Sequence, residues 1–240
     1  ADVRAAFRDQ ALVLLETGVD VIVLETFRQP EEIRLALEGV REALTQVDAK
    51  RRAPIVASVS FDTFGTMADG TGPEELGKRL VALGADAIGV NCADGPAGVY
   101  EMATRMLEAG KPVVAQPNAG LPRRIEGRFA YMASPEYFLV YARRMLKAGV
   151  KGVGGCCGTT ADHVKQIAAA ARMLGAGESQ LIEGGEGGGG MRPPESEWPL
   201  PIAPGVEVTP LAKKGLIGAK LVSGLRGVAT RWWRHPPPRA

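Results

Sequence analysis

The chain has 240 residues, 45% of them hydrophobic, and its 29 basic and 27 acidic side chains leave a net charge of +2. This balance does not indicate nucleic acid or another polyanion as a partner, and no apolar run approaches the roughly 18–20 residues of a transmembrane helix, so we expect no membrane span. Three cysteines, two of them adjacent, cannot make a disulfide framework, which favours a reducing, cytoplasmic compartment.

Helical and strand patterns alternate from the start of the chain to about residue 174. A helix is predicted from Val3 to a stop at Gly18, because apolar residues recur there at helical spacing. Five short apolar runs then read as buried parallel strands, and a helical pattern follows each of them. The predicted strands cover residues 19–24, 55–59, 87–90, 112–115 and 150–153, and the last predicted helix covers 161–174.

This alternation of strands and helices predicts an α/β fold with a parallel sheet, either doubly wound or closed as a barrel. A G-x-G-x-x-G turn follows none of the strands, which weakens the dinucleotide-binding version. A complete (β/α)8 barrel needs eight units in roughly 250 residues. Since the chain shows five units and opens on a helix, we expect it to be an incomplete barrel that lacks its N-terminal units.

The composition changes after Gly175. We interpret residues 1–176 as the barrel module and residues 177–205, which are rich in glycine and proline, as a linker. Residues 206–240 are interpreted as the stub of a second module or a disordered tail. The final Trp- and Arg-containing stretch fits neither a helix nor a strand, and we do not interpret it as a nucleic-acid site.

The three cysteines all follow predicted strands. Cys92 comes directly after one strand, and the adjacent pair Cys156 and Cys157 lies in a glycine-flanked turn after another. The carboxyl ends of parallel strands meet on one face, where βα folds build their sites. Three thiolates suit Zn²⁺ and leave a fourth position for a substrate, although cysteines are also common as buried core residues.

Two of these segments resemble the zinc-binding signatures of the homocysteine S-methyltransferase family. They are Gly89-Val90-Asn91-Cys92 and Gly154-Gly155-Cys156-Cys157-Gly158-Thr159, and the supporting matches are Leu24-Glu25-Thr26 and Gln116-Pro117-Asn118-Ala119-Gly120-Leu121-Pro122. The resemblance extends over about residues 1–174. It implies a (β/α)8 TIM barrel that uses zinc to transfer a methyl group to the thiol of homocysteine, forming methionine.

The resemblance also implies roles for individual residues. Cys92, Cys156 and Cys157 would hold the zinc, and Glu25 would bind the amino group of homocysteine, although a structural ion pair is the other reading of Glu25. Asn91 and Asn118 would either bind substrate or hold loop backbone. The methyl donor, which in the family ranges from betaine and S-methylmethionine to methylcobalamin, cannot be identified from these residues.

The resemblance has two further implications. The part of the barrel that carries an Asp-Gly-rich homocysteine loop in the family is absent, so we expect this chain alone to fold weakly or to aggregate. Val208–Leu221 resembles a junction to a methylenetetrahydrofolate reductase module, so the chain is interpreted as a possible piece of a bifunctional protein.

Two other functions are consistent with the same residues. One is a non-catalytic α/β binding domain with a structural zinc or a thiol cluster, although no fourth protein ligand is evident. The other is a different barrel enzyme with core cysteines, in which Glu25 and Asp62 would be the acid–base groups. Neither histidine is expected to take part, because His163 is placed on an exposed helix face and His235 in the irregular tail.

Overall fold

The structure is a computed structural model that describes residues 2–125 and 128–182. By its internal contacts the chain divides into two compact units, Ala1–Arg172 and Met173–Ala240, and residues 173–182 are the described part of the second unit. The helices are α1 (Val3–Glu16), α2 (Pro30–Gln46), α3 (Pro73–Ala82), α4 (Gly95–Met106), α5 (Pro135–Ala148) and α6 (Ala161–Ile182). Short 3₁₀ turns occupy Ala49–Arg51 and Leu107–Ala109.

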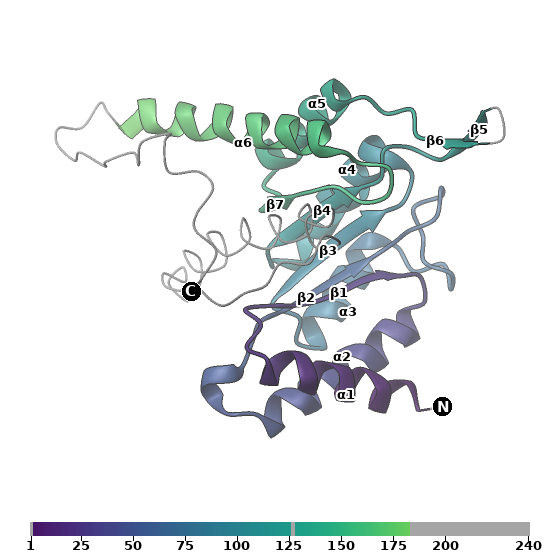
Figure 1. The fold of residues 1–240 in the computed structure, drawn as a ribbon, viewed down its shortest axis with the longest axis vertical. Helices are drawn as coiled ribbons and strands as arrows, with labels where there is room; N and C mark the ends of the chain where they lie inside the picture. Colours follow the sequence, from purple (N-terminus) through teal and green to yellow (C-terminus); the bar gives the residue numbers. More distant parts are fainter. Residues whose placement is uncertain (1, 126–127, 183–240) are drawn as a thin grey trace, which may run out of the picture. The chain divides into compact units, whose positions relative to one another are not determined.

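The centre of the first unit is a parallel sheet with the strand order β1-β2-β3-β4-β7 (Figure 1). Its strands are β1 (Ile22–Phe27), β2 (Ile55–Val59), β3 (Ala87–Cys92), β4 (Val113–Pro117) and β7 (Gly152–Val153). All four pairings are parallel, and every strand precedes a helix. The predicted α/β class, the five strands and the six helices are therefore confirmed.

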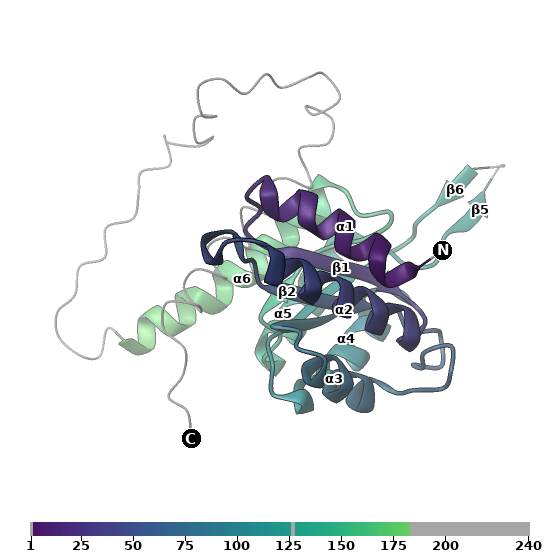
Figure 2. The same ribbon diagram turned by 90° about the horizontal axis from the view of Figure 1, so that it is seen from below.

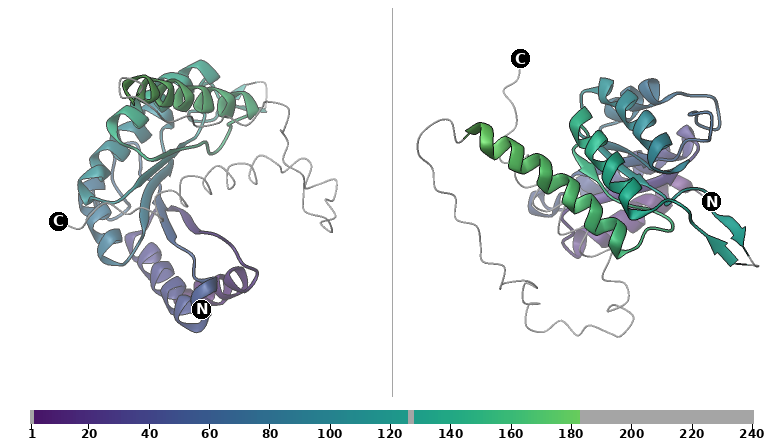
Figure 3. Two further views of the ribbon diagram at one scale, coloured as in Figure 1. Left: turned by 90° about the vertical axis from the view of Figure 1, so that its left-hand side faces the viewer. Right: turned by 90° about the horizontal axis from the view of Figure 1, so that it is seen from above.

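The two faces of the sheet differ in burial. The face toward the helices is apolar and closed to solvent, with Ile55, Ile88 and Val113 at 1% exposure or less. On the other face Val23 is 39% exposed, and its strand neighbour Val56 is half-buried. The helices follow the convex side of the curved sheet (Figure 3, left). This curvature leaves the concave face, which would be the inside of a closed barrel, only partly covered.

Among the described residues, β1 and β7 each pair with one neighbour, so the sheet does not close into a barrel there. The free edge of β1 borders a pocket of about 350 Å³ that α1 also lines. A parallel-sheet edge exposes backbone hydrogen-bonding groups.

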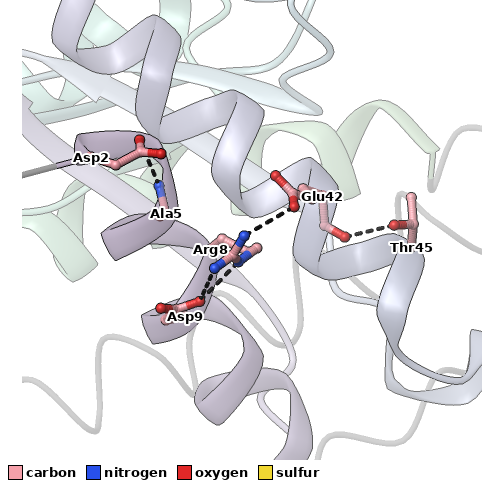
Figure 4. Close-up of polar contacts among 6 residues, drawn as sticks. All are labelled: Asp2, Ala5, Arg8, Asp9, Glu42 and Thr45. Atoms are coloured by element: carbon pink, nitrogen blue, oxygen red, sulfur yellow. Dashed lines mark hydrogen bonds and ion pairs between the residues drawn. The ribbon is translucent and has the colours of Figure 1, made fainter.

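Helices α1 and α2 pack closely, as seen from below in Figure 2. Their backbones approach at Gly39, where an added Cβ would lie 2.4 Å from the carbonyl oxygen of Arg4. Beside this approach Arg8 donates to Glu42 at 3.2 Å and to Asp9 at 2.8 Å, and Asp2 caps the amide of Ala5 (Figure 4). Since both acids around Arg8 are partly exposed, the close backbone packing contributes more to stability than these ion pairs.

The structure differs from the sequence prediction between β4 and α5. A loop was expected there, but residues Arg123–Ile125 (β5) and Arg128–Ala130 (β6) form an antiparallel hairpin that projects from the unit (Figure 1). The side chains of β5 are exposed, so this segment lacks the buried apolar face that a strand prediction depends on.

The last helix is longer than predicted. Helix α6 continues to Ile182, eight residues beyond the predicted end at Leu174 and into the range assigned to the linker. The rest of that linker and the proposed stub at 206–240 lie outside the described residues. In the described part of the chain, no helix is long and apolar enough to cross a membrane.

Candidate metal centre

Three thiols converge at the carboxyl edge of the sheet. The Sγ atom of Cys157 lies 3.9 Å from that of Cys92 and 3.8 Å from that of Cys156, and all three sulfurs lie within 4.8 Å of one another. Cys92 is the last residue of β3, whereas the adjacent pair follows β7, so residues 65 apart in sequence meet here. The expected grouping of the cysteines is present in the structure.

An unusual backbone conformation directs Cys92 toward the pair. Cys92 and Ala93 have φ values of 63° and 53°, the left-handed region that non-glycine residues rarely adopt. Asn118 holds this turn, since its amide nitrogen Nδ2 donates to Ala93 O at 2.8 Å and its backbone N–H donates to Cys92 O at 3.3 Å. The hydroxyl of Ser60 accepts from the Ala93 N–H at 3.4 Å. The extended conformation of β3 therefore ends at Cys92, where the backbone turns.

The cysteine pair is fixed by the backbone at the end of β4 and just beyond it. Cys156 N donates to Pro117 O at 2.8 Å, and Ala119 N donates to Cys157 O at 2.8 Å. The hydroxyl of Thr159 closes the turn by donating to Cys156 O at 2.7 Å. A Cβ on Gly155 would lie 2.6 Å from that hydroxyl oxygen, so glycine is needed for this tight turn.

The Cys92 and Cys156 thiols resist ionisation in the absence of a cation. Burial, together with the two neighbouring thiols, raises the pKa of Cys92 to about 12, because one ionised sulfur disfavours another. Burial also raises the pKa of Cys156. Since an adjacent divalent cation favours the ionised form of each sulfur, the cluster suits a cation better than it suits three free thiolates.

The sulfur spacing fits zinc. With Zn–S bonds of about 2.3 Å, tetrahedral geometry places two ligand sulfurs about 3.8 Å apart. The separations of 3.8 Å (Cys156–Cys157) and 3.9 Å (Cys92–Cys157) match this value, and the third pair lies within 4.8 Å. Cys92 and Cys156 are half-buried and Cys157 is exposed, so three donors are in place and one side remains open.

Asn91 lies beneath the cysteines with its side chain 1% exposed. Its Oδ1 accepts from Thr26 N at 2.9 Å and from Ser58 Oγ at 3.0 Å. Its Nδ2 donates to Thr26 Oγ1 at 2.6 Å, and the sulfur of Cys156 is 3.9 Å away. Asn91 therefore connects β1, β2 and β3 with the cysteine pair.

Glu25 lies at an irregularity of β1. The pairing with β2 shifts between Leu24 and Phe27, which leaves a bulge at Glu25 and Thr26, and Thr26 has a φ of 67°. Glu25 is exposed, and among the described residues its carboxylate has no hydrogen bond or ion pair. This observation counts against the structural ion pair considered for Glu25. The carboxylate lines the pocket beside β1, which does not include the cysteines.

Asn118 carries an unused acceptor. Its side chain is 4% exposed, and its Oδ1 is buried without a hydrogen-bond partner in the described structure. A Cβ on Gly95, the first residue of α4, would lie 3.6 Å from this oxygen. Buried acceptors are normally satisfied, so this oxygen is an acceptor for which the described residues supply no donor.

His163 was expected on an exposed helix face, and this prediction is wrong: the residue is 6% exposed. Its Nδ1 accepts from Thr160 N at 3.0 Å, which assigns the ring proton to Nε2, and Nε2 lies 2.9 Å from Ala133 O. His163 therefore joins the start of α6 to the segment before α5. The Thr-x-x-His spacing before a helix, similar to a capping box, was the available signal.

Asp62 does not resemble an acid–base group. Its Oδ1 accepts from the backbone N–H groups of Phe64 and Thr66, each at 2.9 Å. The bond from Thr66 is the main cause that lowers the pKa of Asp62, and Arg28 adds to it. The carboxylate therefore stabilises its own loop, which weakens the alternative of a barrel enzyme that uses Glu25 and Asp62.

Comparisons with known proteins give consistent matches over most of the chain. A family model described as homocysteine S-methyltransferase matches residues 1–171. Methionine synthase from Mycobacterium leprae (strain TN) is 38% identical over 173 residues, which are 70% of this chain and 14% of that protein. Methionine synthase from Mycobacterium tuberculosis (strain ATCC 25618 / H37Rv) is 37% identical over 186 residues, 75% of this chain and 15% of that protein.

An S-methylmethionine–homocysteine S-methyltransferase from Mus musculus is 29% identical over 184 residues, 69% of this chain and 48% of that enzyme. The chain thus spans about one seventh of the methionine synthases and about half of the mouse enzyme.

Proposed function

Because this chain belongs to the homocysteine S-methyltransferase family, we propose that it transfers a methyl group to the thiol of homocysteine and forms methionine. The resemblance inferred from the sequence motifs is confirmed by the family match. The observation that carries the proposal is the convergence of the Cys92, Cys156 and Cys157 sulfurs at the carboxyl edge of the sheet. No fourth protein ligand is needed if substrate sulfur fills the open position.

The chain's own residues would prepare the substrate for this transfer. Cys92, Cys156 and Cys157 would hold zinc, which supplies a Lewis acid that keeps a bound thiol deprotonated at neutral pH. The homocysteine thiol would release its proton to solvent, its sulfur would form a bond to the methyl carbon, and the bond between that carbon and the donor would break with its electron pair left on the donor. The left-handed turn at Cys92 and the turn closed by Thr159 orient the ligand sulfurs before substrate arrives.

We assign Glu25 and Asn118 to the amino acid part of homocysteine. The Glu25 carboxylate is exposed and unpaired among the described residues, so it is free to accept an ammonium group. The buried Oδ1 of Asn118 offers a second acceptor beside Cys92. These assignments rest on the free acceptors of the two side chains. Asn91 has no comparable free position, since both acceptor positions of its oxygen are taken by Thr26 N and Ser58 Oγ.

The finer features of the fold belong to the same proposal. The curved sheet with a half-exposed concave face supports a (β/α)8 barrel of which this unit is a part. Residues 1–176 would form that module. Val208–Leu221 lies outside the described residues, and the proposed junction to a reductase module there depends on sequence alone. Three reduced thiols favour a cytoplasmic setting.

The experiment uses the full 240-residue chain and its Cys156→Ser variant, with Val140→Ser on the exposed face of α5 as the matched control. Zinc content, homocysteine binding by calorimetry and methionine formation are measured with betaine, S-methylmethionine and methylcobalamin as donors. We expect the wild type and control to bind zinc and homocysteine, and Cys156→Ser to lose both. Zinc retained by Cys156→Ser would refute the ligand assignment, and a wild type that folds and binds zinc but binds no homocysteine would refute the function.

A further inference from the structure

The side chain of Asn91 uses its full hydrogen-bonding capacity inside the protein. A primary amide has two acceptor positions on oxygen and two N–H donors. Both acceptor positions are taken, by Thr26 N and Ser58 Oγ. The N–H donors point to Thr26 Oγ1 and to the sulfur of Cys156. A substrate contact by this 1% exposed side chain would break one of these bonds, so its role is structural organisation of the site.

The two bonds between Asn91 and Thr26 hold Thr26 in an unfavourable backbone conformation. Thr26 is β-branched, and its φ of 67° lies in a region that such residues rarely adopt. Asn91 bonds both the backbone N–H and the hydroxyl of Thr26, which compensates for that conformation. Because Glu25 occupies the same bulge, the lock on Thr26 also sets the direction of the Glu25 side chain.

The second N–H of the Asn91 amide contacts one of the proposed metal ligands. The Nδ2 of Asn91 lies 3.9 Å from Cys156 Sγ, within reach of an N–H···S contact. Hydrogen bonds to metal ligands orient them and tune their basicity, and their loss costs about 10- to 100-fold in metal affinity or activity. One buried amide thus contacts both the Cys156 sulfur and the bulge that carries Glu25.

We propose that Asn91 is a positioning residue that fixes the position of the Cys156 thiolate relative to the bulge that carries Glu25. Thr26 is its hydrogen-bonding partner on β1. The inference rests on the proposed function and deepens it, because it assigns how the metal and homocysteine halves of the site are held together. It predicts that the two halves can be separated by choosing which bond of Asn91 is removed.

The experiment compares a variant that loses both donor contacts of Asn91 with a variant that loses only the bond to Thr26 Oγ1. Asn91→Asp keeps the acceptors for Thr26 N–H and Ser58 O–H but loses both N–H donors. Thr26→Val loses the Oγ1 acceptor and keeps the backbone bond and the contact with Cys156. Thr26→Ser retains the hydroxyl and is the matched control for Thr26→Val.

Two readouts distinguish positioning from a general loss of structure. Cobalt(II) is bound in place of zinc, and its affinity and sulfur-to-cobalt absorption bands report on the ligand sulfurs. Homocysteine binding to the metal-loaded chain is measured by calorimetry.

We expect Asn91→Asp to lower cobalt affinity about 10- to 100-fold and to shift the absorption bands. Thr26→Val should weaken homocysteine binding about three- to tenfold, the effect of one lost hydrogen bond, with cobalt affinity and bands unchanged, while Thr26→Ser should behave as wild type.

Asn91→Asp with wild-type bands and affinity would overturn the proposal. Thr26→Val that weakens cobalt and homocysteine equally would overturn it as well, since that pattern indicates a general structural effect. If Asn91→Asp fails to fold, the comparison of Thr26→Val with Thr26→Ser still tests the proposal, through their cobalt and homocysteine affinities. A wild type that binds cobalt but no homocysteine would instead refute the proposed function, which is a separate outcome.

Discussion

The aromatic ring of Tyr131 occupies the position that a Cβ would take on Gly158, the residue that follows the cysteine pair. A Cβ added to Gly158 would lie 2.2 Å from Cγ of that ring, and Gly158 has a φ of 75°. Tyr131 follows the β5–β6 hairpin, so this contact connects the projecting hairpin to the turn that holds the metal ligands. It therefore supports the geometry of Cys156 and Cys157 from outside the sheet.

This contact predicts that Gly158→Ala lowers metal affinity. The new methyl group would displace either the Tyr131 ring or the cysteine turn, and the left-handed backbone adds a cost of about 1 kcal/mol. Zinc affinity measured by competition with a chelator should fall. The double variant Gly158→Ala with Tyr131→Ala should recover part of the loss, because the obstructing ring is gone. If the second change restores nothing, the Tyr131 contact is not the cause.

The close packing of α1 and α2 predicts that Gly39→Ala destabilises the fold. Its Cβ would meet the backbone oxygen of Arg4 at 2.4 Å, so the helices must separate, at a cost of about 1–3 kcal/mol. Gly175→Ala is the matched control, since among the described residues, and apart from its own helix backbone, no atom lies within 4 Å of a Cβ at that position. Urea titration should show a lower midpoint for Gly39→Ala and an equal or higher one for Gly175→Ala. Equal midpoints for both variants would contradict the close approach.

Removal of metal is expected to lower thermal stability. A ligand that binds the folded state alone contributes about 2.7 kcal/mol at a concentration 100 times its Kd, and for a chain of this size that shifts Tm by about 5–10 °C. Melting of the zinc-loaded chain with and without chelator should show this decrease. Cys156→Ser should melt at one temperature in both conditions. A chelator effect of the same size in that variant would place the metal elsewhere.

The Asp62 loop should loosen in acid. Hydrogen bonds from Thr66 lower the pKa of Asp62 in the folded state below its ordinary value of 3.8. The stabilising contribution is thus fully present above pH 3.8 and is lost as the pH falls through the lower folded pKa. Amide hydrogen exchange at Phe64 and Thr66, followed from about pH 5 to about pH 2.5, should show protection decreasing over that range. Asp62→Asn should lack this change, and an identical profile in the variant would contradict the assignment.

The sequence predicted the parts of this fold that depend on buried apolar runs. The β-branched stretch Ile55–Val59 and the segment Ala87–Val90 could be located because parallel strands are covered on the helix side and read as continuous apolar sequence. The grouping of Cys92 with the cysteine pair followed from their positions at strand ends. The hairpin beyond Gly120 was missed because Arg123 and Arg124 are exposed and show no apolar face.

The remaining site features depend on three-dimensional contacts. Thr26 and Asn91 are 65 residues apart, and no local pattern shows that they bond or that β1 bulges at Glu25. The burial of His163 similarly requires Phe138, whose ring lies 4.8 Å away, and Ala133. Such relations arise after the sheet has assembled, so a single sequence does not reveal them.

The pairing of β4 with β7 has a further consequence for how metal content can be read. Val114 pairs with Gly152 and Ala115 with Val153, and the same ladder continues into the bond between Cys156 N and Pro117 O. A slip of one residue in this pairing would turn the cysteine pair to the opposite side of the sheet, away from Cys92. The fraction of chains that bind zinc would then equal the fraction in which β4 and β7 pair in the correct register. Metal stoichiometry therefore reports on strand register.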